Sequence, residues 1–362
     1  MCGRVEFPWY LLAELCLIVF MRRLPESILP RGDPLALTEC LTHMSSIRSD
    51  ITHQSQKYNL LDLLKSFHPF RTSDPRDKIY AVLGLAADRA SLDLAINYTV
   101  KAEDLYFTAI QRSIVACPNL KFLSHNLGKK LLDLPSWVPD WSTWVYGSLG
   151  VNYDCIYSAS GRMESDFRVN EEERKLDVSG SLVDRITALS SHIGPQYHHV
   201  PTIDIAGRHN WLKEQEMFVS SLERYPDCTD LTDVLWRTLI GNLTFDKTYA
   251  TDDYRLFFDA HRKPQKNRTD EDEVMAKEYI DAVRRKSRNR RLATTSRGYL
   301  AAVPEQTKIG DCICLLHGAR SLFTIREKGQ NFTFIGPAYV QGLMEGEFLE
   351  SEGYEARKIS LV

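Results

Sequence analysis

The chain has 362 residues, of which 43% are hydrophobic and 26% are charged, and its formal net charge at pH 7 is −3. This length and composition predict a globular protein with a sizeable core and room for about two domains. The slightly acidic balance argues against a chain-wide attraction to nucleic acid or to an anionic membrane. Eight cysteines are scattered without a signal peptide before them, so we expect reduced thiols in an intracellular, cytoplasmic protein.

The first apolar segment is "WYLLAELCLIVFM", Trp9–Met21, which is interrupted only by Glu14. It is shorter than the about 20 residues that a membrane-spanning helix needs. The sequence "RRLPES" that follows it is not a signal-peptide cleavage site. We therefore expect a buried helix here and no membrane partner.

Residues 1–145 are predicted to be mostly helical. Apolar residues recur at helical spacing in "PLALTECLTHMSSIRSDI", in "YNLLDLLKSFHPF" and from Ala102 to Ala116. A fourth helix is predicted in the charged stretch "RTSDPRDKIYAVLGLAADRA", between Asp74 and Gly84.

The residues around this fourth helix have the chemistry of helix ends. Ser73 or Asp74 suits the N-cap, and Pro75 suits the first helical position. Gly84 suits a left-handed ending, and Tyr80 and Leu83 are expected to be buried. The charged residues are Asp74, Arg76, Asp77 and Lys78. Local ion pairs explain them, although a charge relay or an anion site at the helix N-terminus is the alternative.

The helical region ends in a Pro/Trp-rich connector, "LPSWVPDWSTW", Leu134–Trp144. Its two prolines exclude a regular helix or a central strand. Tryptophan carries a large apolar surface, so we expect Trp137 and Trp141 to be buried against both halves of the chain. The alternative is an aromatic surface that binds a ligand.

Residues 146–362 are predicted to be a mixed β-rich region, which makes the fold class α+β. "KLDVSGSLVDRIT" indicates short strands separated by Gly and Ser turns. Helices are expected near residues 208–240 and 272–290. Alternating apolar residues and Gly-based turns predict a C-terminal antiparallel unit at residues 292–345, either a small sheet or a barrel.

No pattern in the chain assigns a catalytic, cofactor-binding or metal-binding residue. Phosphate loops, dinucleotide fingerprints, nucleophile elbows and zinc-protease motifs are absent. His198 and His199 are adjacent and lack a third ligand at diagnostic spacing. Cys312 and Cys314 share one face of a predicted strand and are expected in the core. The basic run Arg284–Arg291 is expected to be a solvated face, without specific nucleic-acid binding.

Six landmarks in a fixed order resemble the fungal heterokaryon-incompatibility (HET-domain) family. They are "TSDPRDKIYAVLGLA", "LPSWVPDWS", "LDVSGSLVDRI", "LWRTLIGN", "RLATTSRGYLAAVPEQTKIGDCICLLHGA" and "FIGPAYVQGLMEGE". Together they cover most of residues 70–350. In this family, "LDVSGSLVDRI" corresponds to a strand-turn-strand element.

The resemblance implies a HET-family protein without its N-terminal HET domain, which is TIR-like in this family. "CGRVEFPW" at the start of the chain resembles the piece that follows that domain. The NAD-cleaving activity proposed for TIR-like domains would need residues outside this chain, so no catalytic residue is carried over. The expected function is an interaction or regulatory protein, with no cofactor and with other incompatibility-type proteins as partners.

The alternative is an enzyme or cyclase-like accessory protein from fungal secondary metabolism. Such a protein would bind an apolar terpenoid or polyketide near the connector. A deep apolar cavity lined by Trp137, Trp141 or Trp144 would favour this alternative, and a solid core would favour the interaction protein.

Overall fold

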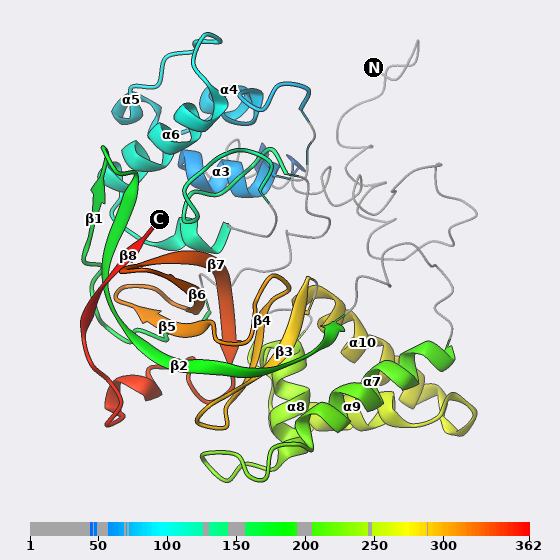
Figure 1. Cartoon of the computed structure of the whole chain (residues 1–362). Coiled ribbons are helices and arrows are strands. Elements are labelled where there is room, and N and C mark those ends of the chain that lie inside the picture. Colours follow the sequence, from blue (N-terminus) through cyan, green and yellow to red (C-terminus); the bar gives the residue numbers. More distant parts are fainter. Residues whose placement is uncertain are drawn as a thin grey trace, which may run out of the picture. The chain divides into compact units, whose positions relative to one another are not determined.

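The fold is α+β, as predicted, with helices in the N-terminal part and a β-rich C-terminal part (Figure 1). The computed structural model describes residues 44–45, 47–48, 57–68, 70, 72–125, 130–143, 156–193, 205–244, 248–287 and 289–362. The contacts within the chain define two units. Unit 1 comprises residues 1–116 and 141–149, and unit 2 comprises residues 117–140 and 150–362.

Unit 1 contains the helices α3 (Leu60–Phe67), α4 (Asp77–Leu83), α5 (Arg89–Leu92) and α6 (Ala102–Ala116). The side chain of Asn59 caps α3, and the helix buries four leucines. α6 has the predicted bounds and buries Tyr106 and Ile110. The apolar spacing of both helices is therefore confirmed, whereas the Trp9–Met21 segment lies outside the described residues.

The charged stretch forms a turn followed by α4, which is shorter than the predicted helix. α4 begins at Asp77, and the carboxylate of Asp74 instead accepts a hydrogen bond of 2.9 Å from the amide of Arg76 in the preceding turn. Tyr80 and Leu83 are buried, as predicted. The left-handed ending predicted at Gly84 is wrong, because its φ of −67° is right-handed and the chain continues into another turn.

Unit 2 contains a closed β-barrel. Its strands are β2 (Lys175–Ile193), β3 (Arg290–Thr295), β4 (Leu300–Pro304), β5 (Cys312–Leu316), β6 (Leu322–Lys328) and β7 (Asn331–Val340). They pair antiparallel in the order β2-β3-β4-β7-β6-β5, and β5 pairs back onto β2. β1 (Phe167–Asn170) and β8 (Arg357–Leu361) pair with the first part of β2.

β2 contradicts the predicted strand-turn-strand element, because it is a single strand of 19 residues. Its ladder shifts register between Leu182 and Asp184 and twice more nearer its end, which lets it bend around the barrel. Gly180 is not a turn residue. A Cβ atom there would lie 2.3 Å from the carbonyl oxygen of Leu315, so glycine permits β2 and β5 to approach closely.

The core of the barrel is apolar, and small side chains share it with large ones. It includes Val183, Ala301, Ile313, Leu322 and Tyr339. The two cysteines of β5 are buried, as predicted for core residues. Burial raises the pKa of the thiols of Cys312 and Cys314, so both stay protonated and chemically inert.

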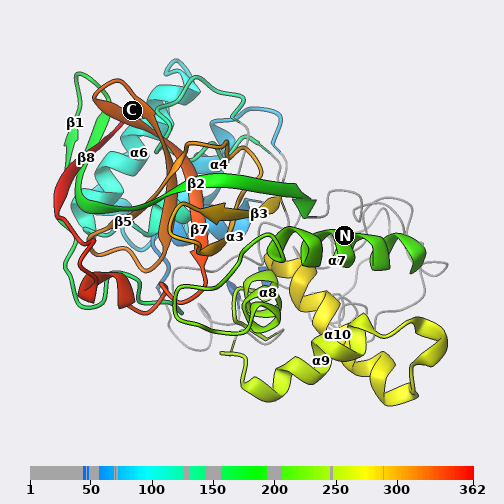
Figure 2. The same ribbon diagram turned by 60° about the horizontal axis from the view of Figure 1, so that its bottom comes forward.

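A group of helices is inserted between β2 and β3 (Figure 2). It consists of α7 (Ile205–Val219), α8 (Leu231–Ile240), α9 (Arg255–Arg262) and α10 (Asp270–Lys286). Asp230 caps the start of α8, and Gly241 ends it with a left-handed φ of 59°. Within the described ranges, no helix has both the length and the hydropathy that a membrane span requires.

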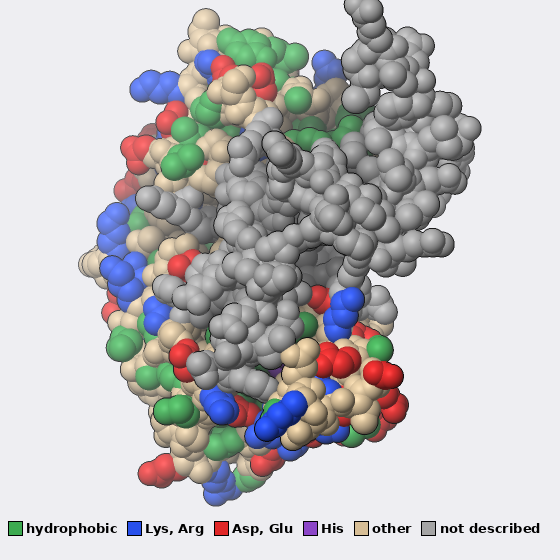
Figure 3. All heavy atoms as spheres, turned by 90° about the vertical axis from the view of Figure 1, so that its right-hand side faces the viewer, with side chains coloured by type: hydrophobic (Ala, Val, Ile, Leu, Met, Phe, Trp, Pro, Cys, Tyr) green, Lys and Arg blue, Asp and Glu red, His purple; other side chains and the backbone are tan. Residues whose placement is uncertain are grey.

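The basic run Arg284–Arg291 is not a solvated face where its side chains are described. Arg290 is 4% exposed and donates hydrogen bonds to the carbonyl oxygens of Pro337 and Ala302. Lys286 is 2% exposed. Figure 3 shows acidic and basic side chains intermixed on one face of the described surface. The expectation of a solvated basic face is thus wrong for Lys286 and Arg290.

Candidate functional site

The connector is folded around two charged side chains of unit 2. The Lys130 ammonium donates hydrogen bonds to the carbonyl oxygens of Ser136 at 2.8 Å and Val138 at 2.6 Å, and also to that of Pro135. The buried carboxylate of Asp140 accepts from the amides of Leu131 at 2.8 Å and Leu132 at 2.9 Å. Prolines cannot form ladder bonds, so these two side chains supply the polar contacts that hold the connector.

Ser136 joins the connector to the barrel. Its amide donates to the main-chain oxygen of Val362 at 2.9 Å, and its hydroxyl donates to the same oxygen. The hydroxyl oxygen also accepts a 2.7 Å hydrogen bond from the amide of Phe334 in β7. One side chain thereby contacts both the residue after β8 and the interior of β7.

The connector tryptophans are packing residues. Trp137 is fully buried, lies edge-on to Phe122 at 6.1 Å between ring centroids, and donates its Nε1–H to the carbonyl oxygen of Arg174 at 3.0 Å. Trp141 belongs to unit 1 and lies edge-on to Tyr106 at 5.2 Å. The burial of both is confirmed. Trp137 also contacts both halves of the chain, as predicted, through Phe122 and Arg174, whereas contact of Trp141 with both halves stays a prediction. Trp144 lies outside the described residues.

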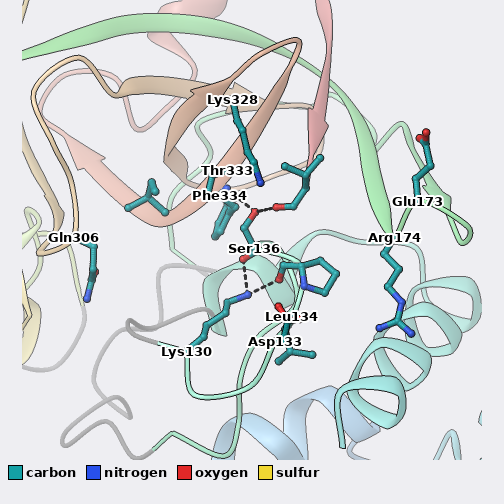
Figure 4. Close-up of a pocket in the computed structure, with 13 residues that line it drawn as sticks. Lys130, Asp133, Leu134, Ser136, Glu173, Arg174, Gln306, Lys328, Thr333 and Phe334 are labelled. Atoms are coloured by element: carbon teal, nitrogen blue, oxygen red, sulfur yellow. Dashed lines mark hydrogen bonds between the residues drawn. The ribbon is translucent and has the colours of Figure 1, made fainter. Parts of the chain in front are cut away.

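A cavity of about 570 Å³ opens beside the connector in unit 2 (Figure 4). Its charged lining consists of Lys130, Asp133, Glu173, Arg174 and Lys328. Its apolar lining consists of Leu134, Pro135, Phe334, Ile335 and Val362. Neither Trp137 nor Trp141 lines it. The cavity adjoins the connector, as the alternative hypothesis expected, but it is lined by charges instead of tryptophan rings.

Two ammonium groups of this cavity approach Ser136. Figure 4 shows the side chains of Lys130 and Lys328 directed toward Ser136 from different sides, whereas Arg174 points away. Burial lowers the pKa of Lys130 to about 7, and the nearby charge of Asp140 opposes that shift. In their protonated forms, the two lysines therefore concentrate positive charge around Ser136.

The charged cluster of unit 1 holds backbone in place. Arg76 forms an ion pair of 2.7 Å with Asp74 and donates to the carbonyl oxygens of Tyr98 and Val100. Its guanidinium lies 5.3 Å from the centre of the Tyr98 ring, and the Tyr98 hydroxyl donates to Asp77 at 2.7 Å. The predicted local ion pair is confirmed, and these charged groups fix the segment that follows α5.

The fourth charged residue of that cluster has a different role. Lys78 is buried in α4 and donates to the carbonyl oxygen of His68 at 2.8 Å and to that of Phe70. Backbone anchoring thus accounts for Lys78, which the sequence offered as part of a charge relay or an anion site.

The remaining sequence candidates do not gather into a site. His198 and His199 lie outside the described residues. Among the described residues, no three or more His, Cys, Asp or Glu side chains are grouped so that they could hold a metal ion. No local sequence pattern pointed to Lys130, Ser136 or Lys328 as a group, because Lys328 comes from a segment remote in the chain.

Among the comparisons with known proteins, the family match covers β3 to β7 of the barrel but not β2. A family model described as the Het-6 beta-barrel domain matches residues 213–360. "Heterokaryon incompatibility protein 6, OR allele" of Neurospora crassa is 23% identical, over 82% of this chain and 52% of that protein. The chain thus spans about half the length of this curated relative. No solved structure matches the chain.

Proposed function

We propose that this chain is a protein of the heterokaryon-incompatibility family that acts by binding other proteins of incompatibility type, because its residues 213–360 match the Het-6 beta-barrel domain. In this proposal the barrel and its helical insert form an interaction or regulatory unit that performs no catalysis. The proposal concerns only the residues of this chain. It starts from the role in heterokaryon incompatibility that the name of the Neurospora protein states.

The packing of Trp137 is the observation that carries the proposal. A ligand-binding aromatic surface would present ring faces to a cavity. Here the ring is fully buried, packs on Phe122, and satisfies its one polar atom through the carbonyl oxygen of Arg174. The most conspicuous aromatic motif of the chain therefore serves the fold, which supports a scaffold for protein contacts.

The alternative ligand, an apolar terpenoid or polyketide, fits the connector cavity poorly. Covering charged groups such as Lys328, Asp133 and Glu173 with hydrocarbon would remove their hydration without replacing it. We therefore rank protein binding above an apolar small-molecule activity.

Heterokaryon assays test this proposal. The chain is expressed in fungal strains that carry different alleles at incompatibility loci, and heterokaryon growth is measured for each pairing. We expect reduced growth in particular pairings and loss of this effect for Trp137→Ala, which removes a fully buried core side chain. Met217→Ala serves as the control, because Met217 is 73% exposed. Equal growth in every pairing contradicts the proposal.

A second assay tests the absence of catalysis. We expect the purified chain to release no nicotinamide from NAD above the background without protein. Release that rises with protein concentration, and survives further purification, would show a catalytic function that the proposal excludes.

A further inference from the structure

Beyond its proposed protein contacts, the chain carries a cavity with the dimensions of a small-molecule site. Ligand cavities in proteins commonly measure about 300–1,000 Å³, and the connector cavity measures about 570 Å³. Its walls come from the connector, the turn before β2, and the hairpin of β6 and β7. The residues that line the cavity all belong to unit 2.

The charged side chains that line the cavity differ in how far other groups of the protein neutralise them. The carboxylate of Glu173 is already paired with Lys175 at 3.0 Å, and Asp133 is exposed to solvent. The negative charge of Asp140 compensates part of the positive charge of Lys130. Among the residues that the structure describes, no hydrogen-bond or ion-pair partner holds the ammonium of Lys328.

Lys130 and Lys328 face the same spot. Both are directed toward Ser136 (Figure 4), so in their charged forms both would attract an anion placed in this part of the cavity. Lys130 cannot turn away, because three carbonyl oxygens of the connector hold its ammonium. An anion placed against Lys328 would pair with an ammonium group that the fold leaves available.

We propose that the connector cavity binds a small anion, a carboxylate or a phosphate, with Lys328 in direct contact and with Lys130, in its protonated form, behind Ser136. The side chains of Leu134 and Phe334 would contact the apolar part of such a ligand. This inference does not depend on the proposed function. It concerns the connector cavity and a small anion, whereas the proposed function concerns protein partners.

Calorimetric titration of the full chain tests the proposal, with inorganic phosphate and benzoate as probes at low ionic strength. We expect saturable binding of at least one probe. Lys328→Gln should weaken it about tenfold, since one charge-assisted contact is lost. Lys277→Gln should leave it unchanged, because Lys277 is an exposed lysine on α10 and its substitution removes the same charge.

The pH dependence adds a readout that a surface site would not show. An anion raises the pKa of a neighbouring ammonium, and that of Lys130 lies near 7 without ligand. Binding at pH 7.5 should therefore take up protons, and the affinity should fall as the pH rises above 7. Titrations in buffers of different ionisation enthalpy measure the proton uptake.

Each possible result of the titrations leads to a different conclusion. Binding of phosphate alone identifies a phosphorylated ligand, and binding of benzoate alone identifies a carboxylate with an apolar body. No binding of either probe overturns the proposal. An equal loss of affinity in Lys328→Gln and Lys277→Gln also overturns it, since that result indicates non-specific attraction to the protein surface.

Discussion

The amide of Ser136 donates a 2.9 Å hydrogen bond to the main-chain oxygen of Val362, although 226 positions separate the two residues. The Ser136 hydroxyl adds a bond to the same oxygen and accepts from the amide of Phe334. This one residue therefore fixes the Pro/Trp connector to the barrel at β7 and at the residue after β8.

Ser136→Ala should lower the free energy of unfolding by about 1–2 kcal/mol, because the Phe334 amide loses its acceptor in a partly buried place. Urea denaturation measures the change. Ser220→Ala is the matched control, since that hydroxyl lies at an exposed helix end. Equal midpoints for the Ser136 variant and the parent would show that the junction contributes nothing.

Trp137→Ala should lower the free energy of unfolding by about 3–5 kcal/mol, the usual cost of truncating a buried aromatic side chain. Such a loss is a large share of the stability of a typical domain, so we expect insoluble or protease-sensitive protein. Trp141→Ala should behave in the same way in unit 1, because its ring is 1% exposed. Limited proteolysis measures both effects.

Trp137→Phe separates packing from hydrogen bonding. This variant keeps an aromatic ring against Phe122 but leaves the carbonyl oxygen of Arg174 without its donor. We expect a smaller loss of stability than in the alanine variant. A Trp137→Ala protein that stays soluble and melts like the parent would disprove the packing role.

Asp74→Ala should lower the melting temperature at neutral pH and have no effect in acid. Hydrogen bonding to Arg76 lowers the pKa of the Asp74 carboxyl below its ordinary value of 3.8. A lowered pKa means that the pair stabilises the fold above pH 3.8 and that this contribution disappears as the pH falls through the lowered value. Thermal melts of both proteins between pH 7 and pH 2 measure the difference, and a gap that persists at the lowest pH would contradict this assignment.

Two glycine substitutions should have opposite effects. Gly180→Ala places a Cβ atom 2.3 Å from the carbonyl oxygen of Leu315 and should destabilise the barrel by at least about 2 kcal/mol. A Cβ atom at residue 84 would lie more than 4 Å from any other group, and the backbone there is right-handed. Gly84→Ala should therefore raise the free energy of unfolding by about 0.4–1 kcal/mol. Chemical denaturation of the two variants tests the pair, and similar effects would show that the close approach of β2 and β5 is unimportant.

Local signals predicted the helices well and the strands less well. Apolar spacing gave the bounds of α6, because a helix that buries one face displays its period in the sequence. The same logic failed at β2, where Gly180 and its neighbouring serines resemble a turn. Glycine is needed there for a close strand contact, and a contact with β5 is invisible in the local sequence.

The connector cavity could not be predicted for a related reason. Lys130, Ser136 and Lys328 are ordinary surface residue types, and each becomes distinctive only through partners remote in the chain. Arg290 misled the sequence interpretation in the same way. It lies in a dense basic run, but the fold buries it against two carbonyl oxygens.

The course of β2 has a consequence for the order of folding. Besides the neighbouring β1, β2 pairs with β3, β5 and β8, and these three strands begin about a hundred or more residues further along the chain. Pairings of such long range raise the contact order and slow folding, since the entropy of closing a long loop is lost before any contact forms. The inserted helices α7 to α10 contact one another at shorter range and can assemble first. The helical insert would then shorten the effective loop between β2 and β3, so that barrel closure becomes the late step in the folding of unit 2.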